Sequence, residues 1–537
     1  MLIRGANAIG YKAYPDNLVE KFIEKSGENG IDVFRIFDSL NWMEGMKTSI
    51  NAVRERTSGL AEGVICYTGD VTNINNTKYN LQYYLDLARQ LEDAGVHMLC
   101  IKDMAGLLKP YAATELITEL KKVVSLPIHL HTHDTASIQS ATYLKAIEAG
   151  VDVIDVAIAS MSGLTSQPSF NSTVAMMQGH PRENKIDLEL LNRQSDYWEI
   201  VREFYYPFES GLKAGTAEVY DHEMPGGQYT NLMQQAASLG LGQKWLEIKK
   251  NYALVNKLFG DIVKVTPSSK VVGDLALFMT SNGYTAEDLL EKGQSIPFPD
   301  SVISFFKGDL GQPYGGFPSK LQKVVLKDEV AYTERPNEHM DPIDFDKEFD
   351  NFQKKYGKEC SFLDFLSYKM YPKVFEEYYH HKVIYGDTSN IPTPAFFYGM
   401  KTYEEIMVPI SKGKNIIVKM LFSFPPDENG MRTVSFELNG QTRRVQVKDL
   451  AFQSVKPTHR KAEKDTEIGS PLQGKLAKIL VKSGQAVKEN TPLFIIEAMK
   501  METTIMAPAV GKVKRIEIKE GELVEQDDLI IELEFNQ

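Results

Sequence analysis

The stretch PIHLHTHD, residues 127–134, decides the fold prediction. Its side chains follow a period of two, so His129, His131 and His133 share one face of a predicted strand. Six short apolar runs, this one included, start about 24 to 34 residues apart, at residues 2–4, 32–37, 63–67, 97–102, 127–134 and 151–159. Helical patterns such as residues 79–94 and 113–124 lie between them. Strands that alternate with helices predict an α/β fold with a parallel sheet, and no glycine-rich phosphate loop follows the first run. We therefore predict a (β/α)₈ TIM-type barrel, of which six units are visible and two are missing.

Polar residues at the carboxyl ends of barrel strands usually carry the chemistry. The chain has ten histidines, and three of them lie in the 127–134 run. Imidazoles two residues apart on a strand can share one cation, so we predict His131 and His133, nearest the rim, as metal ligands. His129 lies deepest and is interpreted as structural. The alternative is a set of hydrogen-bonded core histidines.

Lys102 ends the preceding run. A charged lysine is costly to bury, so this side chain must be paired or chemically altered. A lysine that captures carbon dioxide as a carbamate becomes an anionic oxygen ligand for a divalent metal. The alternative is a lysine that reaches the surface.

The composition is that of an ordinary globular chain. Of its 537 residues, 25% are charged and 43% hydrophobic, with a net charge of −12. Neither nucleic acid nor a membrane is an expected partner, because the chain is acidic and lacks an apolar run long enough to span a bilayer. The three cysteines form no C-x-x-C pair, which excludes a cysteine-based zinc site and a disulfide framework. We expect a cytoplasmic, multidomain protein.

The last 70 or so residues repeat against themselves at an offset of 37 positions, with Pro471 matching Pro508 and Gly474 matching Gly511. Two copies of an alternating strand pattern predict a small pseudo-symmetric β-sandwich, preceded by a polar tether at residues 454–467. Between the copies lies Ala498-Met499-Lys500-Met501, at the expected hairpin turn. This motif resembles the attachment site of biotinyl carrier modules, which implies biotin on Lys500 and a biotin protein ligase as a partner. A lipoyl module and a plain surface lysine are the alternatives.

Several motifs resemble the carboxyltransferase domain of the pyruvate carboxylase family. They are LIRGANAIGYKAYPDN (2–17), IKDMAG (101–106), HLHTHDT (129–135), MSGLTSQP (161–168), YDHEMPGGQYTNL (220–232) and VTPSSKVVGD (265–274). The resemblance extends over nearly the whole chain. It implies a biotin-dependent ligase that transfers a carboxyl group from carboxybiotin to pyruvate, giving oxaloacetate.

The same resemblance implies roles for individual residues. Lys102 would be a carbamylated ligand of zinc or manganese beside His131 and His133, and Arg4 would hold the carboxylate or enolate of pyruvate. Thr266 would move a proton between biotin and pyruvate. Tyr11, Thr266, Ser269 and Lys270 would line the biotin pocket. From the residues alone, Thr266 also reads as a turn-initiating Thr-Pro and Arg4 as an inward-facing barrel arginine.

The resemblance further implies a division into domains: barrel at 1–170, its helical extension at 171–358, a mixed α+β central tetramerisation domain at 359–453, the linker at 454–467 and the carrier at 468–537. We expect a helical 361–385 and strands over 404–447. A homotetramer and an acyl-CoA effector are implied for the central domain. ATP and magnesium would be used only in the biotin carboxylase half, which nothing in this chain resembles.

Set against the family, the chain begins at the third barrel strand, so an aspartate ligand on the family's first strand has no counterpart here. We interpret the sequence as a C-terminal fragment or a reading frame begun at an internal methionine. The alternatives within the family are a decarboxylase or transcarboxylase subunit. From another class, the alternative is a non-catalytic biotinylated scaffold.

Overall fold

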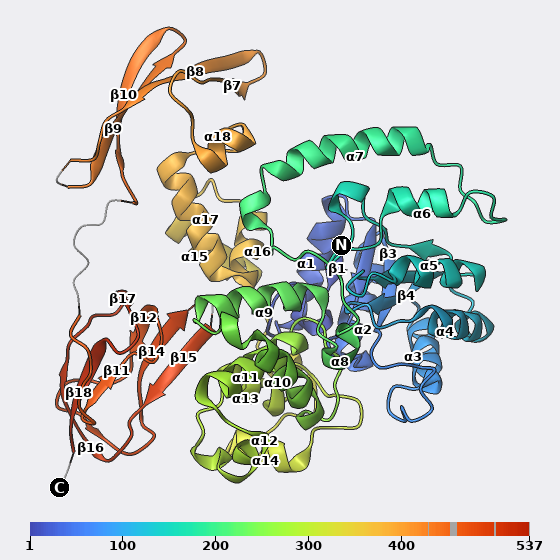
Figure 1. Cartoon of the computed structure of the whole chain (residues 1–537), viewed down its shortest axis with the longest axis horizontal. Coiled ribbons are helices and arrows are strands. Elements are labelled where there is room, and N and C mark those ends of the chain that lie inside the picture. The colour runs from blue at the N-terminus through green and yellow to red at the C-terminus, as the bar shows by residue number, and fades with distance from the viewer. Residues whose placement is uncertain (428, 452–458, 499–500, 536–537) are drawn as a thin grey trace. The chain divides into compact units, whose positions relative to one another are not determined.

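A six-stranded parallel sheet forms the N-terminal part of the protein (Figure 1). The structure is a computed structural model that describes residues 1–427, 429–451, 459–498 and 501–535. The strands lie in chain order, each paired with the next, and are β1 (Leu2–Ile3), β2 (Val33–Ile36), β3 (Leu60–Cys66), β4 (Met98–Asp103), β5 (Ile128–Thr132) and β6 (Val153–Ile154). Because all six strands run the same way, their carboxyl ends meet at one edge of the sheet.

Helices connect successive strands, as the alternating pattern predicts. They are α1 (Asp16–Glu28), α2 (Met43–Arg56), α3 (Leu81–Asp93), α4 (Pro110–Val123) and α5 (Gln139–Glu148). In α3, the Asn80 side chain caps the first turn by accepting the Tyr83 amide, and Leu85, Ala88 and Leu91 are buried on one face. Helix α4 begins at Pro110, where a missing backbone N–H costs nothing.

The last strand of this sheet is shorter than the predicted 151–159 run. β6 ends at Ile154, and Ala159–Met161 form a 3₁₀ turn. Asp155, the residue after Ile154, directs its carboxylate toward His129 and His131. Ala157 forms an isolated β-bridge with Ser169. These contacts take the chain out of the ladder.

A helical region follows the sheet, as predicted. Its helices are α6 (Phe170–Met176), α7 (Leu188–Glu203), α8 (Val219–His222), α9 (Gly226–Ser238), α10 (Trp245–Leu258), α11 (Ser268–Asn282), α12 (Ala286–Glu291), α13 (Asp300–Lys307), α14 (Ser319–Leu326), α15 (Phe345–Tyr356) and α16 (Phe362–Met370). Phe259, Phe305 and Phe306 lie at the centre of its buried core, with ring centroids 5.0 to 5.2 Å apart. None of the helices in the described ranges is long and apolar enough to cross a bilayer.

Residues 200–209 and 367–460 form a separate compact unit. It contains α17 (Pro372–Tyr385), α18 (Thr393–Tyr398) and an antiparallel sheet of β7 (Glu405–Ser411), β8 (Lys414–Ser423), β9 (Met431–Leu438) and β10 (Gln441–Lys448). The predicted helix over 361–385 is two helices, because Pro372 lacks the N–H needed to continue α16 and starts α17 instead. The domain boundaries predicted from the sequence stay predictions.

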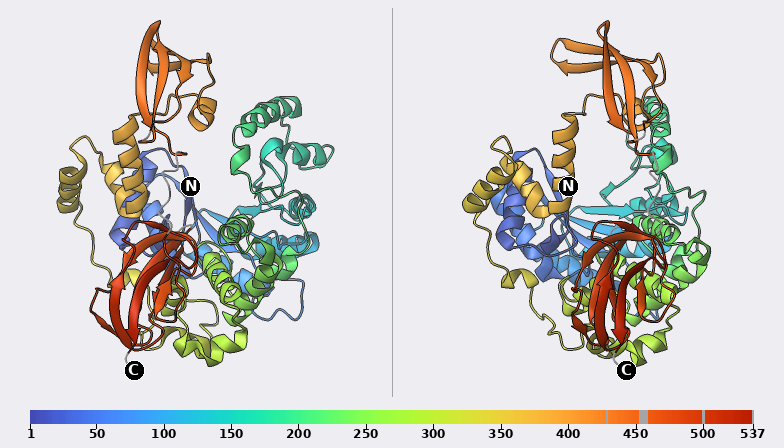
Figure 2. Two further views of the ribbon diagram at one scale, coloured as in Figure 1. Left: turned by 60° about the vertical axis from the view of Figure 1, so that its left-hand side comes forward. Right: turned by 90° about the vertical axis from the view of Figure 1, so that its left-hand side faces the viewer.

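The carrier module, drawn in red in Figure 2, is a β-structure. It is built from two four-stranded antiparallel sheets, in the orders β11-β18-β16-β13 and β15-β14-β12-β17. Its strands are β11 (Glu467–Gly469), β12 (Gly474–Ile479), β13 (Ala486–Val487), β14 (Pro492–Ala498), β15 (Met501–Met506), β16 (Gly511–Ile516), β17 (Leu523–Val524) and β18 (Leu529–Phe535).

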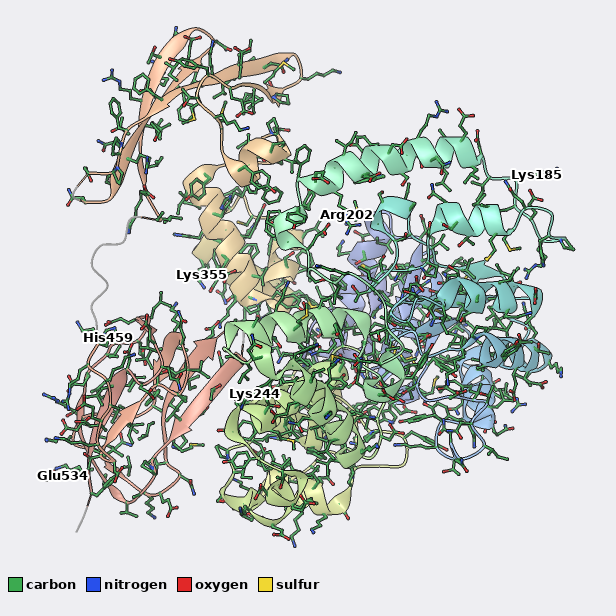
Figure 3. All side chains as sticks on the ribbon, in the orientation of Figure 1. Lys185, Arg202, Lys244, Lys355, His459 and Glu534 are labelled. Carbon is green, nitrogen blue, oxygen red and sulfur yellow. The ribbon has the colours of Figure 1, made fainter. Side chains whose placement is uncertain are left out.

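The 37-residue repeat is visible in this module, since β12, β13 and β14 return as β16, β17 and β18. Equivalent residues are buried in one core: Leu476 with Val513, Val487 with Val524, Phe494 with Ile531 and Ile496 with Leu533. Glu534, next to Leu533, is exposed on the opposite face of its strand (Figure 3). The repeat thus preserves the alternation that fills the sandwich.

Candidate active site

Polar side chains gather at the carboxyl edge of the six-stranded sheet. Lys102 lies at the end of β4 and pairs in register with His131 of β5. His133 follows β5, and Asp155 follows β6. The parallel strands therefore bring together residues that lie up to 53 positions apart in the chain, from Lys102 to Asp155.

His131 and His133 direct one nitrogen each toward a common point. Their Nε2 atoms lie 3.2 Å apart, and the rings are nearly perpendicular, at 78°. His131 Nδ1 lies 2.7 Å from Asp155 Oδ2, and His133 Nδ1 donates to the Thr165 carbonyl at 2.6 Å. Because the oxygens can only accept, each Nδ1 carries the hydrogen and each Nε2 presents its lone pair.

Burial keeps both imidazoles neutral. It lowers the pKa of His131 to about 4, and it lowers the pKa of His133 to about 3, with the neighbouring His131 as the next cause. At neutral pH the two Nε2 atoms are therefore unprotonated, which is the form that binds a metal.

The pair fits a divalent metal. Zinc–imidazole bonds are about 2.0–2.1 Å long, which places two neighbouring ligand nitrogens about 2.9–3.4 Å apart for octahedral to tetrahedral angles. The observed 3.2 Å between the Nε2 atoms falls in this range. No group of three or more histidine, cysteine, aspartate or glutamate side chains in the described part of the chain could hold a metal. The third ligand predicted from the sequence, Lys102, pairs in register with His131 on the neighbouring strand.

Lys102 is buried, with 7% of its surface exposed. Its Nζ lies 5.6 Å from the centre of the Phe37 ring, and burial lowers its pKa. Within the described residues its Nζ makes no hydrogen bond or ion pair. Burial thus favours the uncharged amine, which is the form that reacts with carbon dioxide to give a carbamate.

His131 is hydrogen-bonded to a closed ring of four side chains, which are those of His129, Glu62, Arg35 and Asp155. His129 bonds Glu62 Oε1 at 2.6 Å through Nδ1 and Asp155 Oδ1 at 2.8 Å through Nε2. Arg35 donates to Glu62 and, at 2.6 Å, to Asp155 Oδ2. Burial by itself would raise the pKa of Asp155, but hydrogen bonds from His129, His131 and Arg35 hold that pKa far below its ordinary value. Asp155 is therefore a fixed anion that orients His131.

The segment after β1, residues 4–17, carries Arg4 and Tyr11 and ends in the first turn of α1; it is called the Arg4 loop below. Arg4 Nη1 donates to the carbonyls of Ile9 at 2.7 Å and Gly10 at 3.2 Å. Its guanidinium lies 5.3 Å from the centre of the exposed Tyr11 ring. The side chain of Arg4 is thus held by the backbone of its own loop.

Thr266 lies in a segment that is tied to the same sheet edge. Ser268 Oγ lies 3.2 Å from the carbonyl of Ser39, which follows β2. Lys264 Nζ forms a 2.8 Å ion pair with Glu223 and lies 3.5 Å from Oγ1 of Thr68, which follows β3. Thr266, between these anchors, is half-buried.

Two further predicted residues lie in the first turn of α11. Ser269 is buried, and its amide donates to the Val265 carbonyl at 3.2 Å. Lys270 Nζ pairs with Asp274 at 2.5 Å and keeps 31% of its side chain exposed. Asp274 lies one turn further along the same helix.

Three family profiles match the chain. "HMGL-like" covers residues 17–197, "Conserved carboxylase domain" covers 219–419 and "Biotin-requiring enzyme" covers 466–533. The chain is 50% identical to the solved carboxyl transferase domain of Rhizobium etli pyruvate carboxylase, with a TM-score of 0.82 over 84% of this chain and 76% of that one. The chain belongs to the pyruvate carboxylase family.

Curated members of the family are similar over nearly all of the chain. The pyruvate carboxylase of Bacillus subtilis is 50% identical over 536 residues, and the mitochondrial human enzyme is 44% identical over 539. These matches cover 99% of this chain but 47% and 46% of those proteins, so the chain spans about half the length of its curated relatives. A second Rhizobium etli carboxyl transferase domain structure contains pyruvate and biocytin. This chain is 50% identical to it, with a TM-score of 0.82, and the match covers 84% of this chain and 76% of the solved chain.

The family membership and the barrel-plus-carrier fold predicted from the sequence are confirmed by these matches. The predicted roles of the site residues stay predictions. The structure brings His131 and His133 together and places Lys102 beside His131 on the neighbouring strand. It places Arg4 and Thr266 in segments at the same sheet edge. Lys500 lies outside the described residues; the strands on either side of it pair as β14 and β15, with Glu497 opposite Glu502.

Sequence reasoning missed Arg35, Glu62, Asp155 and Thr165. Arg35 and Glu62 are charged residues inside otherwise apolar strand patterns, and this could have marked them as inward-facing ion-pair partners. No sequence pattern identifies Asp155 or the Thr165 carbonyl, because their roles depend on where the chain turns after β6.

Proposed function

We propose that this chain carries out the carboxyl-transfer half-reaction of pyruvate carboxylase, in which a carboxyl group passes from carboxybiotin to pyruvate to give oxaloacetate. The observation that carries the proposal is the converging pair of His131 and His133 beside the buried Lys102, whose Nζ forms no hydrogen bond or ion pair within the described ranges. Two further observations support the proposal. Arg4 and Thr266 lie in segments at the same sheet edge, and the chain has a biotin-requiring carrier module. Relatives named pyruvate carboxylase support the choice of substrate.

We infer that His131, His133 and a carbamylated Lys102 hold a divalent metal, zinc or manganese. When bound, the metal would act as a Lewis acid on a substrate oxygen. Asp155 and the Thr165 carbonyl keep the Nε2 atoms unprotonated and aimed at the metal position. Hydrogen-bonded partners of this kind are a common support for metal-binding imidazoles.

Arg4 would bind the carboxylate of pyruvate or stabilise the enolate oxygen with its positive charge. Its cationic head already lies against loop carbonyls, which fixes the direction of its remaining donors. Tyr11, Ser269 and Lys270 would line the pocket for the biotin ring.

Thr266 would carry the proton that the reaction must move. The methyl group of pyruvate loses a proton to become a nucleophile, and the ureido nitrogen of biotin needs one when carbon dioxide leaves. A single hydroxyl between the two can accept the first and return it to the second, so that no proton is gained or lost overall. The enolate carbon then forms the new bond to carbon dioxide.

Biotin on Lys500 would supply the carboxyl group, after attachment by a biotin protein ligase. From the family resemblance we also infer a homotetramer, a biotin carboxylase half that uses ATP and magnesium, and an acyl-CoA effector. A cytoplasmic location belongs to the same inference.

The test is the oxaloacetate decarboxylation activity of the biotinylated chain, with Thr266→Ala compared with Thr266→Ser. General acid–base groups contribute about 10²- to 10⁴-fold, so we expect Thr266→Ala to lose at least 10²-fold and Thr266→Ser to retain most of the turnover. Thr114→Ala, at an exposed position of α4, is the matched control. Equal rates in all three variants would reject the role of Thr266. No turnover in any of them, with biotin and metal present, would favour a biotinylated scaffold.

A further inference from the structure

A segment distant in the sequence forms hydrogen bonds and an ion pair with the Arg4 loop. The segment consists of residues 335–343, including a 3₁₀ turn at Pro336–His339, and is called the clamp segment. Arg335 forms an ion pair with Asp16. Asn17 exchanges two hydrogen bonds with the backbone of Ile343, at 2.9 and 3.1 Å. These contacts fix the far end of the loop.

Asn337 makes the contact nearest to Arg4. Its Nδ2 donates to the carbonyl of Tyr14 at 2.6 Å and to the carbonyl of Ala6 at 3.3 Å. An amide carries two N–H donors, so one side chain can hold both carbonyls at once. The two carbonyls lie on opposite sides of the loop, which the Tyr14 amide also closes by donating to Ala6 at 3.2 Å. Asn337 therefore sets the width of the loop at its base.

The loop needs such support because its backbone is strained. Ala8 has φ 45° and ψ −96°, a conformation that residues with a Cβ rarely adopt. A strained conformation persists only where the surrounding structure holds it in place. Asn337 is 3% exposed, so water does not compete readily for its hydrogen bonds.

We propose that Asn337 is a positioning residue for the substrate-binding arginine. Arg4 Nη1 is bound to the carbonyls of Ile9 and Gly10, at the tip of the loop whose base Asn337 closes. Whatever fixes the loop backbone therefore fixes the guanidinium. This inference rests on the proposed role of Arg4 in binding pyruvate. It assigns to the clamp segment the task of keeping the loop in its binding-competent form.

The substitution Asn337→Asp keeps the size of the side chain and removes both donors, so that oxygens face the two carbonyls. A loop that is competent for only part of the time lowers the apparent affinity by that fraction and leaves the saturated rate nearly unchanged. We expect the KM for oxaloacetate to rise about tenfold and the kcat to change less than twofold. A purely structural defect would lower the amount of folded protein without this split. Glu338→Gln, at an exposed position on the same 3₁₀ turn, is the control.

Hydrogen–deuterium exchange of the full chain provides a readout that needs no turnover. In Asn337→Asp the amides of residues 4–14 should exchange at least tenfold faster than in the parent, while those of β4 and β5 stay protected. If the Asn337→Asp variant does not fold, the same exchange measurement is made on Asn337→Ala. Unchanged exchange in the Arg4 loop, or an unchanged KM in an active variant, would overturn the inference. A parent chain without pyruvate binding or turnover would instead reject the proposed function, and the exchange result would still decide whether Asn337 holds the loop.

Discussion

The Nε2 atoms of His131 and His133 face each other at 3.2 Å, while each ring gives its Nδ1 hydrogen to a fixed oxygen. Two lone pairs directed at one point repel each other unless a cation lies between them. The arrangement is therefore stable only because both rings are anchored from behind, His131 by Asp155 and His133 by the Thr165 carbonyl.

The Asp155 carboxylate should control metal affinity. Asp155→Asn removes the charge that holds the His131 Nδ1 hydrogen, and loss of such a partner typically lowers metal affinity about 10- to 100-fold. We expect a decrease of this size in the zinc affinity, measured by competition with a chelator. Glu148→Gln, which removes a surface ion pair with Lys145, should leave the affinity unchanged. Equal zinc affinity in the parent and Asp155→Asn would contradict this account.

Gly226 should matter because it passes close to His133. A Cβ at this position would lie 3.1 Å from His133 Nδ1 and 3.2 Å from the Thr165 carbonyl oxygen, so the ring or the loop would have to move. Gly226→Ala should lower zinc affinity about tenfold, the lower end of the effect expected for disturbing a ligand's support.

The neighbouring glycine offers a matched control. A Cβ on Gly227 would meet no atom within 4 Å, and alanine is favoured over glycine in a helix by about 1 kcal/mol. Gly227→Ala should keep the zinc affinity and raise the melting temperature slightly. If both alanine variants bound zinc equally well, the contact with His133 would be irrelevant.

His222 should make the protein less stable in mild acid. Burial lowers its pKa from 6.5 to about 4, and its Nδ1 accepts the Met224 amide at 3.0 Å, a bond that protonation would break. Between these values the unfolded chain binds a proton that the folded chain does not, so stability falls as the pH falls. The contribution is about 1.4 kcal/mol per pH unit.

The measurement is the melting temperature between pH 7 and pH 4.5. His222→Gln should show a shallower decline than the parent, because glutamine can still accept the amide and does not titrate in this range. His380→Gln, an exposed position on α17, should decline as the parent does. Parallel curves for all three proteins would mean that His222 does not set this dependence.

Lys500 should be the biotinylated lysine. The prediction rests on the Ala498-Met499-Lys500-Met501 motif, which lies in the sequence between the two copies of the 37-residue repeat. With a biotin protein ligase and ATP, the parent chain should gain one biotin, seen by intact-mass measurement. Lys500→Arg should gain none, whereas Lys478→Arg, on β12 of the same module, should be labelled like the parent. A single biotin on Lys500→Arg would place the site elsewhere.

Much of the architecture follows from local patterns in the sequence. The period of two puts His129, His131 and His133 on one face because a strand alternates its side chains whatever its neighbours are. The 37-residue repeat predicts the two-sheet carrier because equal patterns bury equal positions, such as Leu476 and Val513. In both cases the information lies within a few residues or in an exact repetition. The alternating strands and helices predict the parallel sheet for the same reason.

The tertiary structure alone decided which groups support the site. Asp155 reaches His131 across 24 residues, the Thr165 carbonyl reaches His133 across 32, and Asn337 reaches Tyr14 across 323. None of these contacts is set by a local period, because each depends on where a chain turns after a strand or how a remote segment packs. The end of β6 is the sharpest case, because the pattern predicts a strand to residue 159. Instead, the buried His129 and the half-buried Arg35 and His131 bind the Asp155 carboxylate, and the ladder stops at Ile154. The pairing of these partly buried charges outweighs strand propensity there, since leaving them unpaired would cost more than a few lost ladder bonds.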